Sequence, residues 1–299
     1  RIYRTVLDSC RDNRQLVIDK FPKLNRFLTG YDLRHVFNDE MTEFALTRVL
    51  CGSEGTLAFI TEARLDITRL PKVRRLVNVK YDSFDSALRN APFMVEANAL
   101  SVETVDSTVL NLAREDIVWH SVSELITDVA DKTMLGLNIV EFAGDDIELI
   151  DSRVRALCLR LDEQIEQQQG GIIGWQLCEE LAGIERIYAM RKKAVGLLGT
   201  AKGAAKPIPF ADATCVPPEP LADSIVEFRA LLDSHGLNYG MFGHVDAGVL
   251  HVRPALDMCD PQQEILMKEI SDDVVALTAK YGGLLWGEHG KGFRAEYSP

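Results

Sequence analysis

The sequence lacks paired cysteines and long apolar runs, and we expect no signal peptide. Its six cysteines are scattered and form no Cys-x-x-Cys pair, which excludes a zinc ribbon and an iron–sulfur binding run within this chain. Scattered cysteines usually act as small buried hydrophobic side chains in proteins of a reducing compartment. Because no apolar run approaches the roughly 18 residues of a transmembrane helix, we expect no transmembrane segment and a cytoplasmic or peripheral protein.

Basic residues are outnumbered by acidic ones. Lysine and arginine total 33 against 45 aspartates and glutamates, which gives a net charge of -12. A nucleic-acid partner requires a basic face, so we expect no nucleic-acid binding. A small anionic substrate stays open, since one local arginine can hold it. With 299 residues, of which 46% are hydrophobic, the chain is long enough for a buried core and for more than one domain.

Turn signals and hydrophobic periodicity divide the chain near Pro71-Lys72. Residues 46–70 predict a strand, a glycine turn and a second strand. Beyond the division, strands alternate with helices, which predicts an α+β domain with an antiparallel sheet over 71–299. The expected strands are 75–80, 101–105, 134–142, 238–244 and 249–253, and the expected helices are 83–90, 147–169, 177–198, 221–235 and 265–281. The proline-rich segment 199–220 is expected to be extended or loop.

Two short segments near the C-terminus contain residue types suited to a metal site. With a turn at 247–248, His244 would lie opposite His251 in a hairpin, with Cβ atoms about 4.5–5.5 Å apart. That spacing suits two imidazoles on one metal ion, although two strand histidines that face each other by chance are the simpler interpretation. Glu288 is a natural third ligand that leaves an open position. Its neighbour His289, which points the other way in a regular strand, would serve as a base.

The glycine turn at 52–56 carries a resemblance to a known family, although the turn alone could be an ordinary hairpin. Residues 50–63 resemble the FAD-contacting segment of flavoproteins of the vanillyl-alcohol oxidase and p-cresol methylhydroxylase (PCMH) type. Residues 243–251 and 288–290 resemble the C-terminal domain of the D-2-hydroxy-acid dehydrogenase branch. That branch includes D-lactate dehydrogenase, the glycolate oxidase flavin subunit and D-2-hydroxyglutarate dehydrogenase. The stretch 239–254 looks most like the large bacterial members, in which an iron–sulfur portion follows the flavin portion.

The resemblance implies a fold, cofactors and residue roles. It predicts the C-terminal part of a PCMH-type FAD-binding domain at 1–70 and an α+β substrate domain at 71–299. The first FAD subdomain is then expected before Arg1 and an iron–sulfur cluster beyond Pro299, so that the chain is an internal fragment. The implied cofactors are FAD and a divalent metal, with zinc as the expected ion. The implied roles are flavin contact for Gly52, Ser53, Glu54, Gly55, Thr56 and Ile60, metal ligation for His244, His251 and Glu288, proton transfer for His289, and a substrate carboxylate clamp for Arg191.

Three departures from the family pattern concern the substrate pocket. Residues 246–249 are Asp-Ala-Gly-Val where the family often has Gly-Asp-Gly-Asn, Arg253 replaces a common asparagine, and Ala211 stands where a lysine is usual. Lys206, a few residues upstream, is the candidate substitute for that lysine. Arg253 would add positive charge, which favours a dicarboxylate such as D-2-hydroxyglutarate over lactate. The alternative interpretation of Arg253, as an ordinary surface residue of a strand, carries equal weight.

These features predict an FAD-dependent oxidoreductase that oxidises a D-2-hydroxy acid, with the α-hydrogen leaving as hydride to the flavin. Two other interpretations stay open. One is a metal-stabilised structural or docking module without redox activity of its own. The other is an alkyl transferase or aromatic-alcohol oxidase of the same superfamily, which the histidine pair disfavours. The expected partner is a small 2-hydroxy acid; the electron acceptor and a homo-oligomeric state stay open. The expected location is the cytoplasm or the periphery of the inner membrane.

Overall fold

A single antiparallel sheet forms the main part of the molecule. The structure, a computed structural model, describes residues 1–26, 30–200 and 203–289. Eight strands form the sheet in the order β4-β1-β3-β2-β7-β8-β5, and β6 pairs with β8. The strands are β1 (Val73–Tyr81), β2 (Ser101–Asp106), β3 (Gly136–Gly144), β4 (Ile172–Cys178), β5 (Lys206–Pro207), β6 (Thr214–Cys215), β7 (Tyr239–His244) and β8 (Val249–Leu256). All of these pairings are antiparallel, so the predicted α+β fold with an antiparallel sheet is confirmed.

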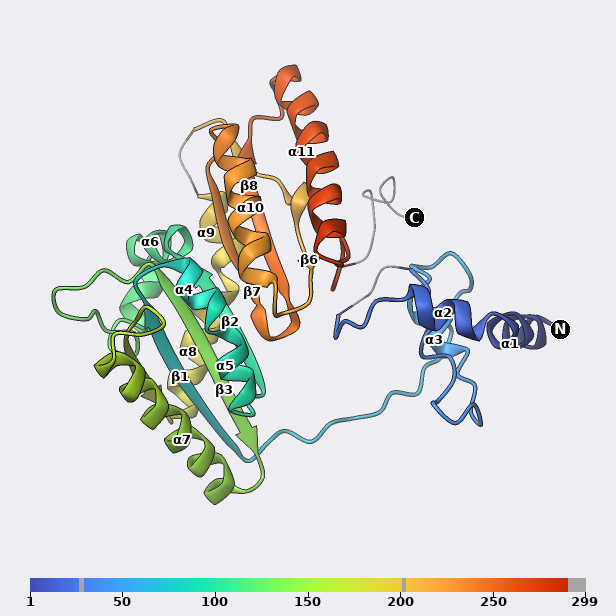
Figure 1. Ribbon diagram of the computed structural model, residues 1–299, viewed down its shortest axis with the longest axis horizontal. Helices are drawn as coiled ribbons and strands as arrows, with labels where there is room; N and C mark the ends of the chain where they lie inside the picture. Colours follow the sequence, from blue (N-terminus) through green and yellow to red (C-terminus); the bar gives the residue numbers. More distant parts are fainter. Residues whose placement is uncertain (27–29, 201–202, 290–299) are drawn as a thin grey trace.

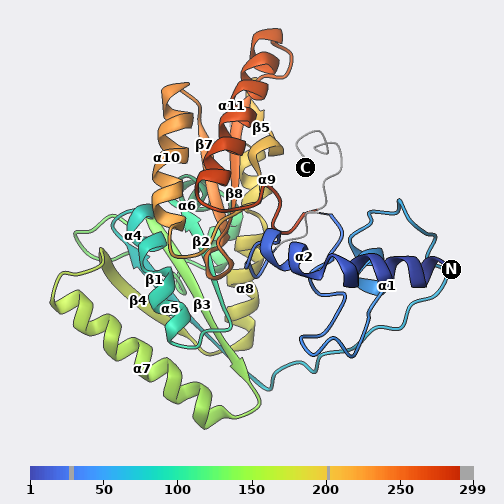
Figure 2. The ribbon, with the colours of Figure 1, turned by 45° about the vertical axis from the view of Figure 1, so that its right-hand side comes forward.

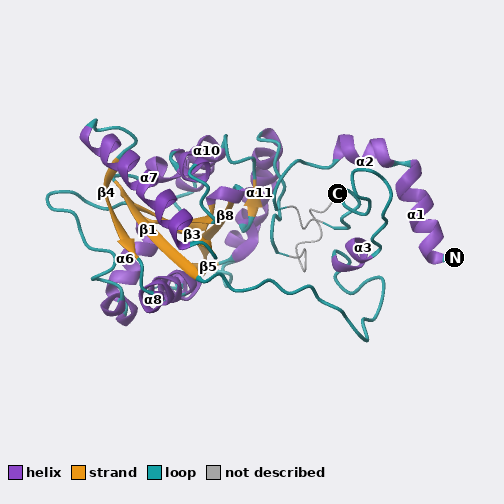
Figure 3. Ribbon diagram, turned by 90° about the horizontal axis from the view of Figure 1, so that it is seen from below, coloured by secondary structure: helices purple, strands orange, loops and turns teal. Residues whose placement is uncertain are grey.

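Helices cover both faces of this sheet, as Figure 3 shows for α7 and α10 on one side and α6 and α8 on the other. One face carries α4 (Phe84–Arg89), α5 (Ala91–Glu96), α7 (Ile147–Glu166), α10 (Leu221–Ser234) and α11 (Pro261–Lys280), and the other carries α6 (Ser107–Glu115), α8 (Leu181–Lys192) and α9 (Ala194–Gly199). Side chains of β1 alternate between the two faces. Val77 and Val79 pack in the first core cluster and Leu76 in the second. The sheet is therefore buried on both sides and gives a rigid base for the residues at its strand ends.

The region before the sheet is built differently. It contains the short helices α1 (Ile2–Asp12), α2 (Arg14–Lys20) and α3 (Thr47–Cys51), and its small core consists of Cys10, Val36, Phe37 and Val49. A segment without regular secondary structure, 57–70, then leads to β1 (Figures 1 and 2). The strands predicted within 46–70 are therefore wrong. A strand needs a partner for its backbone N–H and C=O groups, and among the described residues 57–70 pair with none.

The stretch 172–199 also differs from prediction. A single helix was expected over 177–198, but the chain forms β4 and then two helices, α8 and α9. Strand β4 pairs with β1, with Trp175 opposite Val79. Sheet pairing therefore decides the structure up to Cys178, where the local periodicity suggested a helix.

The cysteines and helices agree with most of the compositional expectations. Cys10, Cys158, Cys178 and Cys215 are buried, as predicted, whereas Cys51 and Cys259 are exposed. In the described ranges, no helix combines the length and apolarity needed to cross a bilayer.

Candidate active site

The two hairpin histidines lie on one face of the sheet, but not in the predicted register. Strands β7 and β8 are joined by the 3-10 turn η3 (Val245–Ala247) and by Gly248, whose φ is +70°. This connection is longer than the predicted two-residue turn, so His244 pairs with Val249 and His251 pairs with Phe242. The prediction that His244 lies opposite His251 is therefore wrong by two residues. Because a shift of two preserves the face of each side chain, both rings still point the same way, with centroids 5.5 Å apart.

Gly248 has a specific role in this turn. A Cβ atom at this position would lie 1.8 Å from the backbone oxygen of Val216, and the left-handed backbone disfavours other residues as well. A larger residue would push the turn away from the loop after β6. The glycine therefore fixes the end of the hairpin from which His244 and His251 project.

Glu288 meets both histidines at their Nε2 atoms. Its Oε2 lies 3.3 Å from Nε2 of His244 and 3.4 Å from Nε2 of His251. One ligand atom from each of the three residues lies within 4.8 Å of the others, which is a geometry that a metal ion can bridge. The structure thus brings together the three residues that the sequence analysis predicted as ligands.

A carboxylate holds each imidazole from behind. Nδ1 of His244 lies 2.6 Å from Oε1 of Glu103, which stands opposite it in β2. Nδ1 of His251 lies 3.0 Å from Oδ1 of Asp212. An ionised carboxylate only accepts hydrogen bonds, so each Nδ1 donates to the carboxylate behind it, and Nε2 is the ring nitrogen that each histidine directs at Glu288. Sequence reasoning missed Glu103 and Asp212; Glu103 lies in a strand that also contains Ser101, Thr104 and Asp106, so its local sequence does not single it out.

Burial and charge set the protonation of this cluster. Burial lowers the pKa of His251 by more than the hydrogen bond to Asp212 raises it, which favours the neutral imidazole. Burial would raise the pKa of Glu103, but the hydrogen bond from His244 and the charge of Arg191 outweigh it and lower the pKa. The pKa of Asp212 is lowered in the same way, against burial, by His251 and then by Arg253. For His251, a neutral imidazole backed by an ionised carboxylate is the form that binds a metal.

Three further predicted residues lie next to this cluster, and each contacts Glu103 or Asp212. Arg191 on α8 reaches Oε2 of Glu103 with Nε at 3.0 Å and Nη2 at 2.9 Å. Arg253 on β8 reaches Oδ2 of Asp212 with Nη2 at 2.9 Å, and His289 lies 3.3 Å from the same oxygen through Nδ1. The His289 ring also stacks on His251 with centroids 5.2 Å apart. Arg191, Arg253 and His289 therefore lie directly beside the predicted ligands.

The remaining predicted residues lie elsewhere. Lys206 in β5 pairs with Leu256, at the opposite end of β8 from His251. The predicted flavin turn, 52–56, follows α3 in the region before the sheet, where the hydroxyl of Tyr31 lies 3.4 Å from Oγ1 of Thr56. Figure 1 shows α3 beside α2, apart from the strands that carry the histidines. Ile60 follows in the segment 57–70, and its side chain is exposed.

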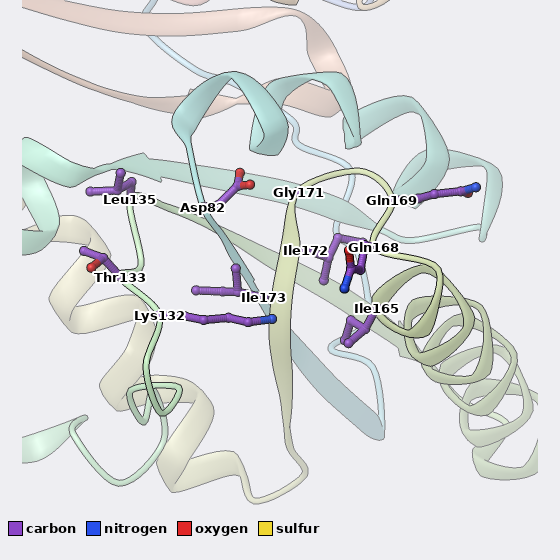
Figure 4. A pocket seen from close by; sticks show the side chains of 10 residues that line it. All are labelled: Asp82, Lys132, Thr133, Leu135, Ile165, Gln168, Gln169, Gly171, Ile172 and Ile173. Carbon is purple, nitrogen blue, oxygen red and sulfur yellow. The ribbon is translucent and has the colours of Figure 1, made fainter.

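A separate pocket of about 480 Å³ lies on another part of the sheet region (Figure 4). Its lining includes Ile173 of β4, Gln168 of the loop before β4, Asp82 just after β1 and Lys132 of the loop before β3. None of the predicted site residues lines this pocket. The histidine cluster, and not this pocket, is therefore the candidate active site.

Several known proteins are similar in sequence to this chain. Residues 70–298 match the family model described as FAD linked oxidases, C-terminal domain. A D-2-hydroxyglutarate dehydrogenase of Escherichia coli is 87% identical over 100% of this chain and 29% of its own length. The protein of the same name in Pseudomonas putida is 52% identical over 100% of this chain and 29% of its length. The glycolate oxidase subunit GlcD of Bacillus subtilis is 21% identical over 90% of this chain and 51% of its length. The chain thus spans 29% of the length of the first two relatives.

Proposed function

Because this chain belongs to the family of FAD linked oxidases, C-terminal domain, we propose that it is the substrate side of an FAD-dependent D-2-hydroxy-acid dehydrogenase. The reaction takes a D-2-hydroxy acid to the 2-oxo acid, with hydride transfer to the flavin. We assign residues 1–70 to the flavin side, with contacts from Gly52, Ser53, Glu54, Gly55, Thr56 and Ile60. The names of the relatives at 87% and 52% identity support D-2-hydroxyglutarate as the substrate.

One observation carries the proposal of a metal site. Glu103 and Asp212 hold the two Nδ1 atoms, and both Nε2 atoms face Oε2 of Glu288, at 3.3 and 3.4 Å. Two imidazole nitrogens and one carboxylate oxygen that converge in this way form a set of ligand atoms that a metal cation can bridge. A divalent ion fits this donor set, and two histidines with one carboxylate leave a fourth position open, which is typical of catalytic zinc.

His289 is the proposed general base. When bound, the ion would supply Lewis-acid polarisation of the substrate hydroxyl, and FAD would accept the hydride. His289 directs Nδ1 to Asp212, which leaves Nε2 to take the hydroxyl proton. Asp212 stabilises the imidazolium that results, as an acceptor buried beside it.

Arg191 and Arg253 are the proposed substrate anchors. Arg191 uses Nε and Nη2 on Glu103, so its other N–H groups are left to orient the 2-carboxylate. The Nε atom of Arg253 is buried and has no partner among the described residues. That unsatisfied donor beside the cluster supports binding of a second carboxylate, and hence of a dicarboxylate. Lys206 stays a prediction that its place in β5 does not support.

Replacement of His289 tests the proposed reaction in the intact gene product. We expect His289→Ala to slow flavin reduction by D-2-hydroxyglutarate by about 10²–10⁴-fold, since general-base catalysis contributes about that much. Stopped-flow absorbance of the flavin measures the rate. His235→Ala, at the end of α10, is the matched control and should leave the rate unchanged. An unchanged rate in His289→Ala would contradict the base assignment, and no reduction by any D-2-hydroxy acid in the wild type would contradict the function.

A further inference from the structure

Each of the three proposed metal ligands has a charged or hydrogen-bonding partner behind it. Glu103 holds His244 and Asp212 holds His251, both through Nδ1. The partner of Glu288 is Arg26, whose Nη1 contacts Oε1, the oxygen that faces away from the histidines. Two of these partners belong to the sheet region. Arg26 lies 262 residues before Glu288, in the region before the sheet.

The chain around Arg26 is anchored against the hairpin that carries the histidines. Leu24 is buried in a cluster with Cys215, Ala247 and Val249, at the turn between β7 and β8. Figure 1 shows the segment after α2 extending toward this part of the sheet. Because Leu24 fixes the backbone two residues earlier, the Arg26 side chain is directed at Glu288 by packing as well as by charge.

We infer that Arg26 is a positioning residue of the proposed metal site, which the region before the sheet thereby completes. This inference rests on the metal site under Proposed function. By holding Oε1, the guanidinium leaves Oε2 as the oxygen that faces the two imidazoles. Outer partners of this kind orient metal ligands, and their loss typically weakens metal binding by about 10–100-fold. The Arg26 side chain is 43% exposed, so its removal leaves the core intact.

The opposite role makes the opposite prediction. If Arg26 were a counter-ion that a metal must displace from Glu288, its removal would strengthen metal binding. The direction of the change in affinity therefore decides between a positioning residue and a competitor.

Zinc affinity of the intact gene product tests this inference. Zinc-stripped wild type, Arg26→Gln, Arg26→Lys and the control Lys23→Gln would compete for zinc with a chromophoric chelator. We expect a zinc Kd about 10-fold higher for Arg26→Gln, a smaller rise for Arg26→Lys, which keeps the charge but loses the planar fork, and no change for exposed Lys23→Gln. An unchanged or lower Kd in Arg26→Gln would overturn the assignment. Absence of zinc binding in the wild type would instead overturn the proposed metal site, and this inference with it.

Amide hydrogen exchange distinguishes a positioning role of Arg26 from a purely structural one, because only a positioning role makes exchange near Arg26 depend on zinc. Zinc should slow amide exchange in residues 21–26 of the wild type, because the metal fixes Glu288 and with it Arg26. The same protection should be absent in Arg26→Gln while the zinc-free proteins exchange alike. If 21–26 exchange equally with and without zinc in the wild type, the proposed link between this segment and the metal site is wrong.

Discussion

Leucine side chains experience different surroundings in the two regions of the molecule. Leu137 in β3 is fully buried, whereas Leu65 in the segment 57–70 is 80% exposed. The sheet region, 71–289, has helices on both faces and a continuous core on each. The region before it, 1–70, has one small cluster around Cys10 and Phe37.

The difference separates the stability of the fold from the assembly of the site. The sheet region positions His244, His251 and Glu288 together with the carboxylates behind both histidines. The region before it adds the contact from Arg26 to Glu288. The sheet region is therefore expected to determine the free energy of unfolding. The region before the sheet is expected to adjust the site without adding much to the core.

Matched leucine truncations give the largest expected effect. Leu137→Ala removes a fully buried side chain and should lower the free energy of unfolding by about 2–5 kcal/mol. Leu65→Ala should change it by less than about 0.5 kcal/mol, since surface substitutions rarely do more. Urea unfolding followed by circular dichroism measures both. Similar losses in the two variants would break the distinction between the regions.

Replacement of the residues that contact the proposed metal ligands should have an intermediate effect. Asp212 is buried and contacts His251, Arg253 and His289, whereas Arg26 is partly exposed and contacts Glu288. Asp212→Asn should therefore raise the zinc Kd toward the upper end of the range of about 10–100-fold, above the rise for Arg26→Gln. Chelator competition compares the two variants directly. A larger effect from Arg26→Gln would mean that the region before the sheet contributes more to the site than the sheet itself.

Local patterns predicted which residues come together in the proposed metal cluster, but not what surrounds them. His244, His251 and Glu288 lie in short segments bounded by glycine, and their residue types indicate a metal site. Glu103 and Asp212 lie 141 and 39 residues from their histidines, and only the sheet and the loop before β6 bring them close. The hairpin register depends on a 3-10 turn that ends in a left-handed glycine, which the predicted two-residue turn did not include.

The incorrect prediction of strands within residues 46–70 has a related cause. The run Leu57-Ala58-Phe59-Ile60 has the composition of a strand. Such residues form a strand only where a neighbouring strand is present to pair with them, and composition alone does not supply that neighbour. The same limit applies to the end of β4 near Cys178, which was predicted as helix. Its pairing partner, β1, is distant in the sequence, so the local pattern did not reveal the strand.

X-ray absorption at the zinc edge of the intact gene product tests whether His244, His251 and Glu288 bind a metal ion. We expect one zinc ion per chain, bound by two imidazole nitrogens and by oxygen at roughly 2.0–2.2 Å. Glu288→Gln should lower the zinc content, while the exposed control Lys23→Gln should match the wild type. Zinc with sulfur ligands at roughly 2.3 Å, or a protein that retains no divalent metal at this cluster, would contradict the account.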